Sequence, residues 1–211
     1  MAKLYFKYGA MGSSKSANAL MAEYNYAERG KKVLLAKSQI DTREGRKRIR
    51  SRIGLEHDCI YMEELLNEEV CKALLVIRES PYSEEAMRWK SRLCENQLHC
   101  DAIIVDEAQF ATVEQIDFLS DIVDFLDIPV LCYGLRTDFQ NVAFPGSLRL
   151  LEIADLMEEI KTVCWCGRKA TCNARYNEHG IVRHGEQIEI GANDKYVALC
   201  RKHLKEGRLH P

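Results

Sequence analysis

The feature that most constrains the fold is an octapeptide of mostly small residues near the start of the chain, Gly9-Ala10-Met11-Gly12-Ser13-Ser14-Lys15-Ser16. It follows a β-prone run at residues 4–8 and precedes a helical pattern at residues 17–24. Small residues between a strand and a helix let backbone N–H groups surround a phosphate at the positive end of the helix dipole. The sequence therefore predicts a phosphate-binding loop, with Lys15 reaching the β- and γ-phosphates and Ser16 as a Mg²⁺ ligand.

One position of this loop departs from the usual pattern, because Ser14 stands where a second glycine is common. We interpret it as a small residue that fills the position without a strict glycine conformation. The alternative for the whole octapeptide is an ordinary turn between a strand and a helix, closed by a solvated lysine. The flanking strand and helix favour the phosphate loop over that alternative.

Apolar runs alternate with helical patterns through the first three quarters of the chain. Strands are expected at residues 32–37, 101–105 and 128–134, and helices at residues 62–98 and 113–125. Continuous apolar strands separated by helices are typical of an α/β layer structure with a mainly parallel sheet. We therefore expect an α/β fold of the phosphate-loop NTPase-like type.

Two segments do not follow this alternation. Residues 41–52 are charged and irregular, and we expect the basic cluster at residues 46–52 to be mobile and solvated. After about residue 158 the composition changes to cysteines, glycines and short β-prone runs. We therefore predict a nucleotide-binding domain over residues 1–158 and a small second domain over residues 159–211.

Two carboxylates follow the predicted strand at residues 101–105. In phosphate-loop proteins, an acid at such a strand end holds Mg²⁺, usually through water, which is the role expected for Asp106. Glu107 is expected to act as general base and take the proton of the attacking nucleophile. If strand geometry continued, the two side chains would point to opposite faces of the sheet. The alternative is an ordinary strand-end turn, where acids are common, but the phosphate loop favours the functional interpretation.

The sequence Asp106-Glu107-Ala108-Gln109 also matches a helicase motif. A nucleic-acid-dependent ATPase is therefore an alternative to a small-molecule kinase as the function of the chain. Motors of that kind need two tandem domains or a ring of larger subunits, and usually a basic track. This chain has 211 residues, 30 Lys plus Arg against 32 Asp plus Glu, and a formal net charge of −2. The charge balance therefore counts against nucleic acid as a partner.

The sequence also bears on the compartment. Its apolar runs are much shorter than a membrane span, and its first residues have neither the apolar region nor the cleavage site of a signal peptide. The nine cysteines are therefore expected to be reduced thiols. We expect a soluble cytoplasmic protein with no membrane partner.

Two close pairs of metal-ligating residues lie in the last quarter of the chain. Cys164-Trp165-Cys166 and Cys200-Arg201-Lys202-His203 are separated by 33 residues. Zn²⁺ takes four N or S ligands in a tetrahedron, and two such pairs supply them while cross-linking the loop between them. This predicts a closed, structural zinc site. Further candidate ligands inside the loop are Cys172, His179 and His184, and the alternative is a group of reduced, buried cysteines.

In combination, these motifs make the chain resemble the thymidine kinase family of the cytosolic, zinc-containing type, and its enterobacterial members in particular. The likeness runs along nearly the whole chain and is most distinctive in Gly191-Ala192-Asn193-Asp194-Lys195-Tyr196, followed by Cys200 and His203. The resemblance implies phosphoryl transfer from ATP to the 5′-hydroxyl of thymidine in nucleotide salvage. It also implies Mg²⁺ with ATP, structural Zn²⁺, a lasso loop over the nucleoside, a homotetramer, and inhibition by thymidine triphosphate.

The resemblance further implies roles for individual residues. Besides the octapeptide and Asp106, Arg43 of an Asp-Thr-Arg triplet would lie near the phosphates and stabilise the transferring charge. Met11 would line the pocket near the methyl group of thymine. The zinc ligands that it implies are Cys164, Cys166, Cys200 and His203, although many relatives have Cys-x-x-Cys as the first pair. The substrate-binding positions that it implies are Gln109, Phe110, Leu135, Phe139, Gln187, Ile188, Glu189, Ile190, Gly191 and Tyr196.

Core packing is the alternative role for each aromatic residue in this set. Phe139 sits in a polar loop, which favours function, whereas Phe110 follows a helix start and is compatible with the core. Tyr196 in isolation is typical of a half-buried strand residue. A deoxynucleoside is neutral, so its site needs aromatic stacking and a few hydrogen bonds more than a basic groove.

Overall fold

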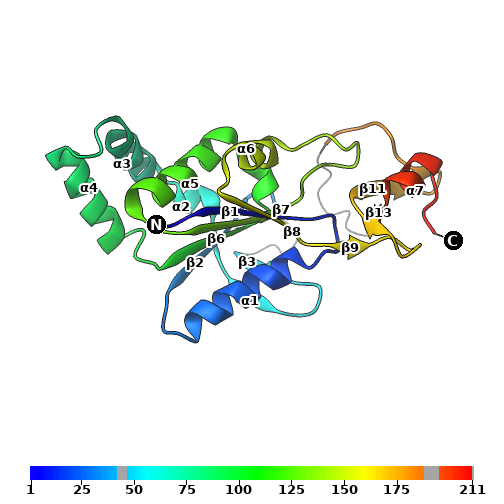
Figure 1. Cartoon of the computed structure of the whole chain (residues 1–211), viewed down its shortest axis with the longest axis horizontal. Helices are drawn as coiled ribbons and strands as arrows, with labels where there is room; N and C mark the ends of the chain where they lie inside the picture. The colour runs from blue at the N-terminus through cyan, green and yellow to red at the C-terminus, as the bar shows by residue number, and fades with distance from the viewer. Residues whose placement is uncertain (42–46, 188–194, 211) are drawn as a thin grey trace.

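The computed structural model describes residues 1–41, 47–187 and 195–210. Its central sheet consists of β1 (Leu4–Tyr8), β2 (Val33–Lys37), β5 (Ile60–Tyr61), β6 (Ala102–Asp106), β7 (Val130–Gly134) and β8 (Leu156–Glu159). The strand order is β5-β2-β6-β7-β1-β8, and all neighbouring strands are parallel (Figure 1). The expected α/β fold with a mainly parallel sheet is confirmed.

Helices lie on both sides of this sheet (Figure 1). One side carries α1 (Lys15–Ala27), and the other carries α2 (Met62–Leu65), α3 (Glu68–Glu79), α4 (Glu84–Glu95), α5 (Val113–Leu126) and α6 (Pro145–Ile153). Three of these helices begin after a residue whose side-chain oxygen accepts an N–H of the first turn, namely Asn67, Ser83 and Thr112. Such caps satisfy backbone donors that would otherwise have no partner inside the helix.

The middle strand β6 shows how the two apolar cores form. Ile103 and Val105 belong to the cluster that includes α5 and α6, and Ile104 belongs to the cluster that includes α1. All three side chains are 0% exposed. Because successive side chains of a strand point to opposite faces, a continuous apolar run supplies both cores at once.

A short hairpin lies beside α1. Its strands β3 (Arg48–Arg50) and β4 (Glu56–Asp58) pair antiparallel. Ile49 is 2% exposed and packs in the α1 core, whereas Arg48 forms ion pairs with both acids of β4. The expectation of an irregular segment is therefore wrong for residues 48–50, where Ile49 is buried, whereas Lys47, Arg50 and Arg52 are exposed as expected.

A small unit lies at the opposite end of the molecule from α3 and α4 (Figure 1). Its own core contains several of the cysteines. It is built from β9 (Thr162–Val163), β10 (Lys169–Ala170), β11 (Cys172–Asn177), β12 (Gly180–Ile181), β13 (Tyr196–Leu199) and α7 (Arg201–Glu206). The last strand of the central sheet, β8, ends one residue beyond the expected boundary at 158, and the division into two domains stays a prediction.

Three elements of the central layer were not expected from the sequence, namely β5, α6 and β8. Helix α6 begins with Pro145 and Gly146, which are unfavourable inside a helix, although proline fits the first helical position. Strand β8 is short and exposed at the edge of the sheet, so it lacks the apolar pattern of the inner strands. Among the described residues, no helix is long and apolar enough to cross a membrane.

Candidate active site and metal centre

The octapeptide forms the connection between β1 and α1, as expected. The chain turns through Gly12 at φ +73° and Ser14 at φ +62°, and α1 begins at Lys15. Ser14 therefore adopts the left-handed conformation that glycine favours. The interpretation that this position does not need a glycine conformation is wrong. A serine in this conformation has a higher backbone conformational energy than a glycine would have.

Lys15 lies inside this loop and is 8% exposed. Its ammonium donates to the carbonyl of Ala10 at 3.0 Å and, at 3.4 Å, to the carbonyl of Gly9 and the hydroxyl of Ser13. The loop thus holds a buried positive charge at the N-terminal end of α1. This is the arrangement that an anionic phosphate needs.

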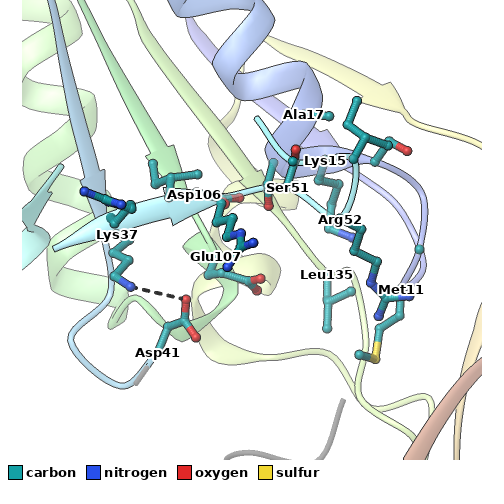
Figure 2. Close-up of a pocket in the computed structure, with 18 residues that line it drawn as sticks. Met11, Lys15, Ala17, Lys37, Asp41, Ser51, Arg52, Asp106, Glu107 and Leu135 are labelled. Atoms are coloured by element: carbon teal, nitrogen blue, oxygen red, sulfur yellow. Dashed lines mark ion pairs between the residues drawn. The ribbon is translucent and has the colours of Figure 1, made fainter. Parts of the chain in front are cut away.

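The loop borders a cavity of about 340 Å³ at the carboxyl ends of β2 and β6 (Figure 2). The hairpin that contains β3 closes another side of it. The charged residues that line this cavity are Lys15, Lys37, Asp41, Arg48, Arg50, Arg52, Asp106 and Glu107. Met11 and Leu135, two of the expected nucleoside contacts, also line it. The cavity therefore brings together the expected phosphate loop, acid pair and apolar lining.

Asp106 ends β6 and is 4% exposed. The Ser16 side chain forms a hydrogen bond to this carboxylate, whereas Oδ1 has no hydrogen-bond partner among the described residues. Burial, and then the charge of Glu107, raise the pKa of Asp106 to about 6, although the Ser16 hydroxyl opposes both effects. A buried carboxylate oxygen without a partner, beside a hydroxyl, is a donor set that fits Mg²⁺.

Glu107 lies just beyond the end of β6, where its φ of +53° turns the chain into the 3₁₀ turn Ala108–Phe110. Its carboxylate accepts a hydrogen bond from the Nε2 amide of Gln109 at 2.5 Å. Glu107 and Asp106 both line the same cavity. The expectation of opposite faces depended on continued strand geometry, and this condition is not met, because β6 ends at Asp106 and Glu107 has a positive φ.

Gln109 is 1% exposed, and its amide oxygen accepts the backbone N–H of Leu135 at 3.0 Å. The structure thus places this expected substrate contact in the buried turn after β6, where it joins Glu107 to the residue that follows β7. Its role toward substrate stays a prediction.

Four cationic residues at the cavity were missed by the sequence analysis, namely Lys37, Arg48, Arg50 and Arg52. Lys37, the last residue of β2, pairs in register with Asp106 and is 1% exposed, and its Nζ lies 3.7 Å from Asp41 Oδ2 (Figure 2). Arg52 extends from the hairpin toward the phosphate loop (Figure 2), and its Nη1 would lie 3.8 Å from a Cβ on Gly12. Arg43, the cation that the sequence favoured, lies outside the described residues.

The two phenylalanines expected to contact the base differ in their burial. Phe110 is half-buried and packs edge-to-face on Phe144, with ring centroids 5.7 Å apart. Phe139 is only 3% exposed, and the guanidinium of Arg175 lies 3.9 Å from its ring centroid. The polar loop around Phe139 therefore folds onto the small unit, so polar neighbours in the sequence did not indicate an exposed ring.

The expected lasso residues are described only in part. Gln187 donates from Nε2 to Asp138 at 3.1 Å, and the Tyr196 hydroxyl accepts a hydrogen bond from Arg175 at 2.7 Å. Both residues thus lie near the loop that carries Phe139. The other four expected contacts fall outside the described residues: Ile188, Glu189, Ile190 and Gly191.

Asn173 on β11 joins the small unit to the phosphate loop. It is 3% exposed, its Oδ1 accepts the backbone N–H of Met11 at 2.8 Å, and its Nδ2 donates to the carbonyl of Thr137 at 2.7 Å. Because both ends of the amide are used, Asn173 fixes two loops of the site relative to each other. The sequence offers no signal for this role, since an asparagine in a strand has many possible partners.

The four expected zinc ligands come together in the small unit. The ligand atoms of Cys164, Cys166, Cys200 and His203 all lie within 4.8 Å of one another. Cys164 Sγ lies 3.4 Å from His203 Nδ1. In a tetrahedron with Zn–S of about 2.3 Å and Zn–N of about 2.1 Å, ligand atoms are roughly 3.5–3.8 Å apart. The cluster therefore fits Zn²⁺.

The surroundings of this cluster also suit a metal. Burial disfavours the ionised thiol of Cys164, but backbone N–H groups of Cys166 and Cys200 and the side chain of His203 outweigh it and lower the pKa to about 6. The indole of Trp165 stacks on the His203 ring at 4.1 Å between centroids. Of the spare candidates, Cys172 is buried outside the cluster and His179 and His184 are exposed.

The comparisons with known proteins point to one family. The sequence model described as "Thymidine kinase" matches residues 2–204. The chain belongs to the thymidine kinase family. It is 48% identical over 213 residues to the thymidine kinase of Mannheimia succiniciproducens, with complete coverage of both chains. It is also 47% identical over 210 residues to that of Zymomonas mobilis, covering 98% of this chain and 97% of that one.

Solved structures give a weaker likeness. The Pif1 helicase from Candida albicans is 14% identical over 77% of this chain and 36% of that chain, with a TM-score of 0.43. A likeness at this level carries no argument about function. Nothing in the comparisons therefore favours the nucleic-acid-dependent ATPase over the thymidine kinase family.

Proposed function

We propose that this chain transfers the γ-phosphoryl group of ATP to the 5′-hydroxyl of thymidine and so produces thymidine monophosphate. The observation that carries the proposal is that Lys15, Asp106 and Glu107 all line the same cavity. A phosphate loop and an acid pair in one cavity supply the parts that phosphoryl transfer requires. Sequence similarity to thymidine kinases along the chain supports thymidine as the phosphoryl acceptor.

Each charged group has a role in this proposal. Lys15 and the N–H groups of the phosphate loop bind the phosphates of ATP, and Glu107 accepts the proton of the 5′-hydroxyl. Gln109 holds the Glu107 carboxylate toward the cavity through its 2.5 Å hydrogen bond. Because phosphoryl transfer depends mostly on positioning and charge stabilisation, this fixed geometry contributes directly to the rate.

Asp106 and Ser16 would hold Mg²⁺ together with ATP. The ion would supply charge neutralisation on the phosphate oxygens. The buried Oδ1 of Asp106, which has no hydrogen-bond partner among the described residues, and the contact of the Ser16 hydroxyl with the same carboxylate support this assignment. Arg43 is proposed as a further phosphate contact.

The nucleoside is proposed to bind between the end of β7 and the small unit. Its contacts would include Met11 and Leu135 at the cavity, with Phe110, Phe139, Gln187 and Tyr196 beyond it. Apolar and aromatic side chains with a few polar groups suit a neutral base. Residues 188–191 would complete the site as part of the lasso.

Structural Zn²⁺ at the Cys/His cluster would stabilise the small unit that carries Tyr196. We further propose that residues 1–158 and 159–211 act as two domains. We also propose assembly as a homotetramer in the cytoplasm and inhibition by thymidine triphosphate, which membership of the thymidine kinase family supports.

The decisive experiment measures ATP turnover with one added compound at a time: thymidine, another deoxynucleoside, or single-stranded DNA. We expect thymidine monophosphate to accumulate with thymidine and no stimulation by DNA. Lys15→Ala should abolish turnover without unfolding the chain. ATP hydrolysis that depends on DNA, without nucleoside phosphorylation, would contradict the proposal and favour the ATPase alternative.

A further inference from the structure

Arg175 on β11 is a buried cation that the phosphate chemistry does not use. It is 5% exposed and pairs in register with Tyr196 on β13. Among the described residues, its guanidinium contacts the loop of Phe139, the start of β13, and the chain at residues 186–187. Each segment carries a residue that we assign to the nucleoside site.

The contact between Arg175 and Tyr196 has a defined direction. The Nε–H of Arg175 donates to the Tyr196 hydroxyl at 2.7 Å, and a guanidinium has donors but no acceptor. The hydroxyl oxygen is therefore the acceptor, and its own hydrogen points elsewhere. Within residues 1–41, 47–187 and 195–210, that hydrogen has no acceptor. Tyr196 is thus set up to donate a hydrogen bond to a ligand.

The other contacts of Arg175 fix the surroundings of this hydroxyl. Its guanidinium carbon lies 3.9 Å from the ring centroid of Phe139, which is within cation–π range. Its Nη2 donates to the carbonyl of Glu186 at 2.8 Å, just before residues 188–194. One planar group therefore stacks on an aromatic ring and donates hydrogen bonds in two other directions.

We propose that Arg175 is the positioning residue of the nucleoside site. It makes the Tyr196 hydroxyl a donor toward an acceptor oxygen of the nucleoside, holds the ring of Phe139, and anchors the chain at Glu186. The inference rests on the proposed function, which it extends to a residue without a role in phosphate binding. A lysine cannot replace it, because a compact ammonium lacks the planar fork needed for all three contacts.

The test compares Arg175→Lys with the parent chain in steady-state kinetics. Loss of one or two positioned hydrogen bonds should raise the KM for thymidine roughly tenfold. The KM for ATP and the zinc content should stay within about twofold of the parent. Arg183→Lys is the matched control, because Arg183 also lies in the small unit and donates to backbone carbonyls of α7, at Leu204 and Lys205. It should leave the KM for thymidine unchanged.

Tyr196→Phe tests the same inference in a chain that keeps Arg175. Removing only the hydroxyl should also raise the KM for thymidine, and it should add little in the Arg175→Lys background, because the two groups act through one hydrogen bond. If the two effects simply multiply, or if Tyr196→Phe leaves the KM unchanged, the inference is wrong. A fall in thermal stability with kcat reduced and both KM values unchanged would indicate a merely structural arginine and would likewise overturn it.

The same measurements separate this inference from the proposed function. A parent chain that does not phosphorylate thymidine contradicts the proposed function. A parent chain that does, with an Arg175→Lys variant that keeps the thymidine KM of the parent, contradicts only the role of Arg175.

Discussion

The side-chain amide of Gln109 joins the Glu107 carboxylate to the backbone N–H of Leu135. Its Nε2 donates to Glu107 at 2.5 Å, and its Oε1 accepts from Leu135 at 3.0 Å. The acceptor contact fixes which end of the amide faces Glu107, so the carboxylate receives a donor. Since Gln109 is 1% exposed and Glu107 lines the cavity, this bond is partly shielded from water.

The first prediction concerns the base. Glu107→Gln keeps the shape of the side chain but cannot accept a proton, so turnover should fall by about 10²–10⁴-fold with little change in either KM. Steady-state kinetics at saturating Mg²⁺ measure this. Asp106→Asn is the comparison, and it should instead raise the Mg²⁺ concentration needed for half-maximal rate. If Glu107→Gln raised the Mg²⁺ requirement and Asp106→Asn lowered turnover at saturating Mg²⁺, the roles of base and metal ligand would be exchanged.

The second prediction concerns pH. The pKa of Asp106 is raised to about 6, mainly by burial, so the folded chain keeps a proton that the unfolded chain releases near pH 4. The unfolded state thus binds fewer protons between these values, and the stability of the Mg²⁺-free protein should fall as pH rises through this window. The full effect is at most about 3 kcal/mol. Binding of Mg²⁺, which needs the ionised carboxylate, should strengthen over the same window.

Chemical unfolding at pH 4.5 and 6.5 measures this slope, in buffer free of Mg²⁺ and of chelators so that any bound zinc is retained. Asp106→Asn should remove the contribution of this group, and the difference between the two chains isolates it. A parent and variant with equal slopes would show that Asp106 ionises normally.

The third prediction concerns the zinc cluster. Purified protein should contain about one zinc per chain, and Cys200→Ser should lower that number and the thermal stability together, since metal binding and folding of such a site are coupled. Cys172→Ser is the matched control, because Cys172 is equally buried in the same core but lies outside the cluster. Metal analysis by mass spectrometry gives the count. Loss of zinc from the Cys172 variant alone would mean that the ligand set is different.

The fourth prediction concerns Ser14 in the phosphate loop. A non-glycine residue in the left-handed region carries a cost on the order of 1 kcal/mol, so Ser14→Gly should stabilise the fold by up to about that amount and keep its activity. Ser14→Ala, which retains a Cβ, should give no gain. Thermal and denaturant unfolding test both variants. A Ser14→Gly chain that is less stable than the parent would argue against the left-handed backbone.

Local patterns in the sequence were sufficient for much of the fold. The buried strands and the phosphate loop depend on a few adjacent residues, so apolar runs and small-residue spacing predict them directly. The zinc ligands are also local in pairs, and their two pairs converge as expected. The hairpin at β3 was missed because one isoleucine among arginines is a weak apolar signal, although it is enough to bury the strand.

Contacts between distant segments account for what sequence reasoning missed. Lys37, Arg52, Asn173 and Arg175 look in the sequence like ordinary polar residues, and their partners lie elsewhere in the chain. The burial of Phe139 was also not apparent from the sequence, because its sequence neighbours are polar and the ring packs against Arg175 from another segment.

The sequence alone thus determined the parallel sheet, the phosphate loop, the acid pair and the Cys/His cluster that fits zinc, because each is encoded by neighbouring residues or by close ligand pairs. Only the tertiary structure decided which cations reach the cavity and which polar groups contact the residues that we propose for nucleoside binding. The physical reason is that a charged or amide side chain has the same local pattern whether it is solvated or buried. Its role depends on partners that folding brings within hydrogen-bonding distance from other segments.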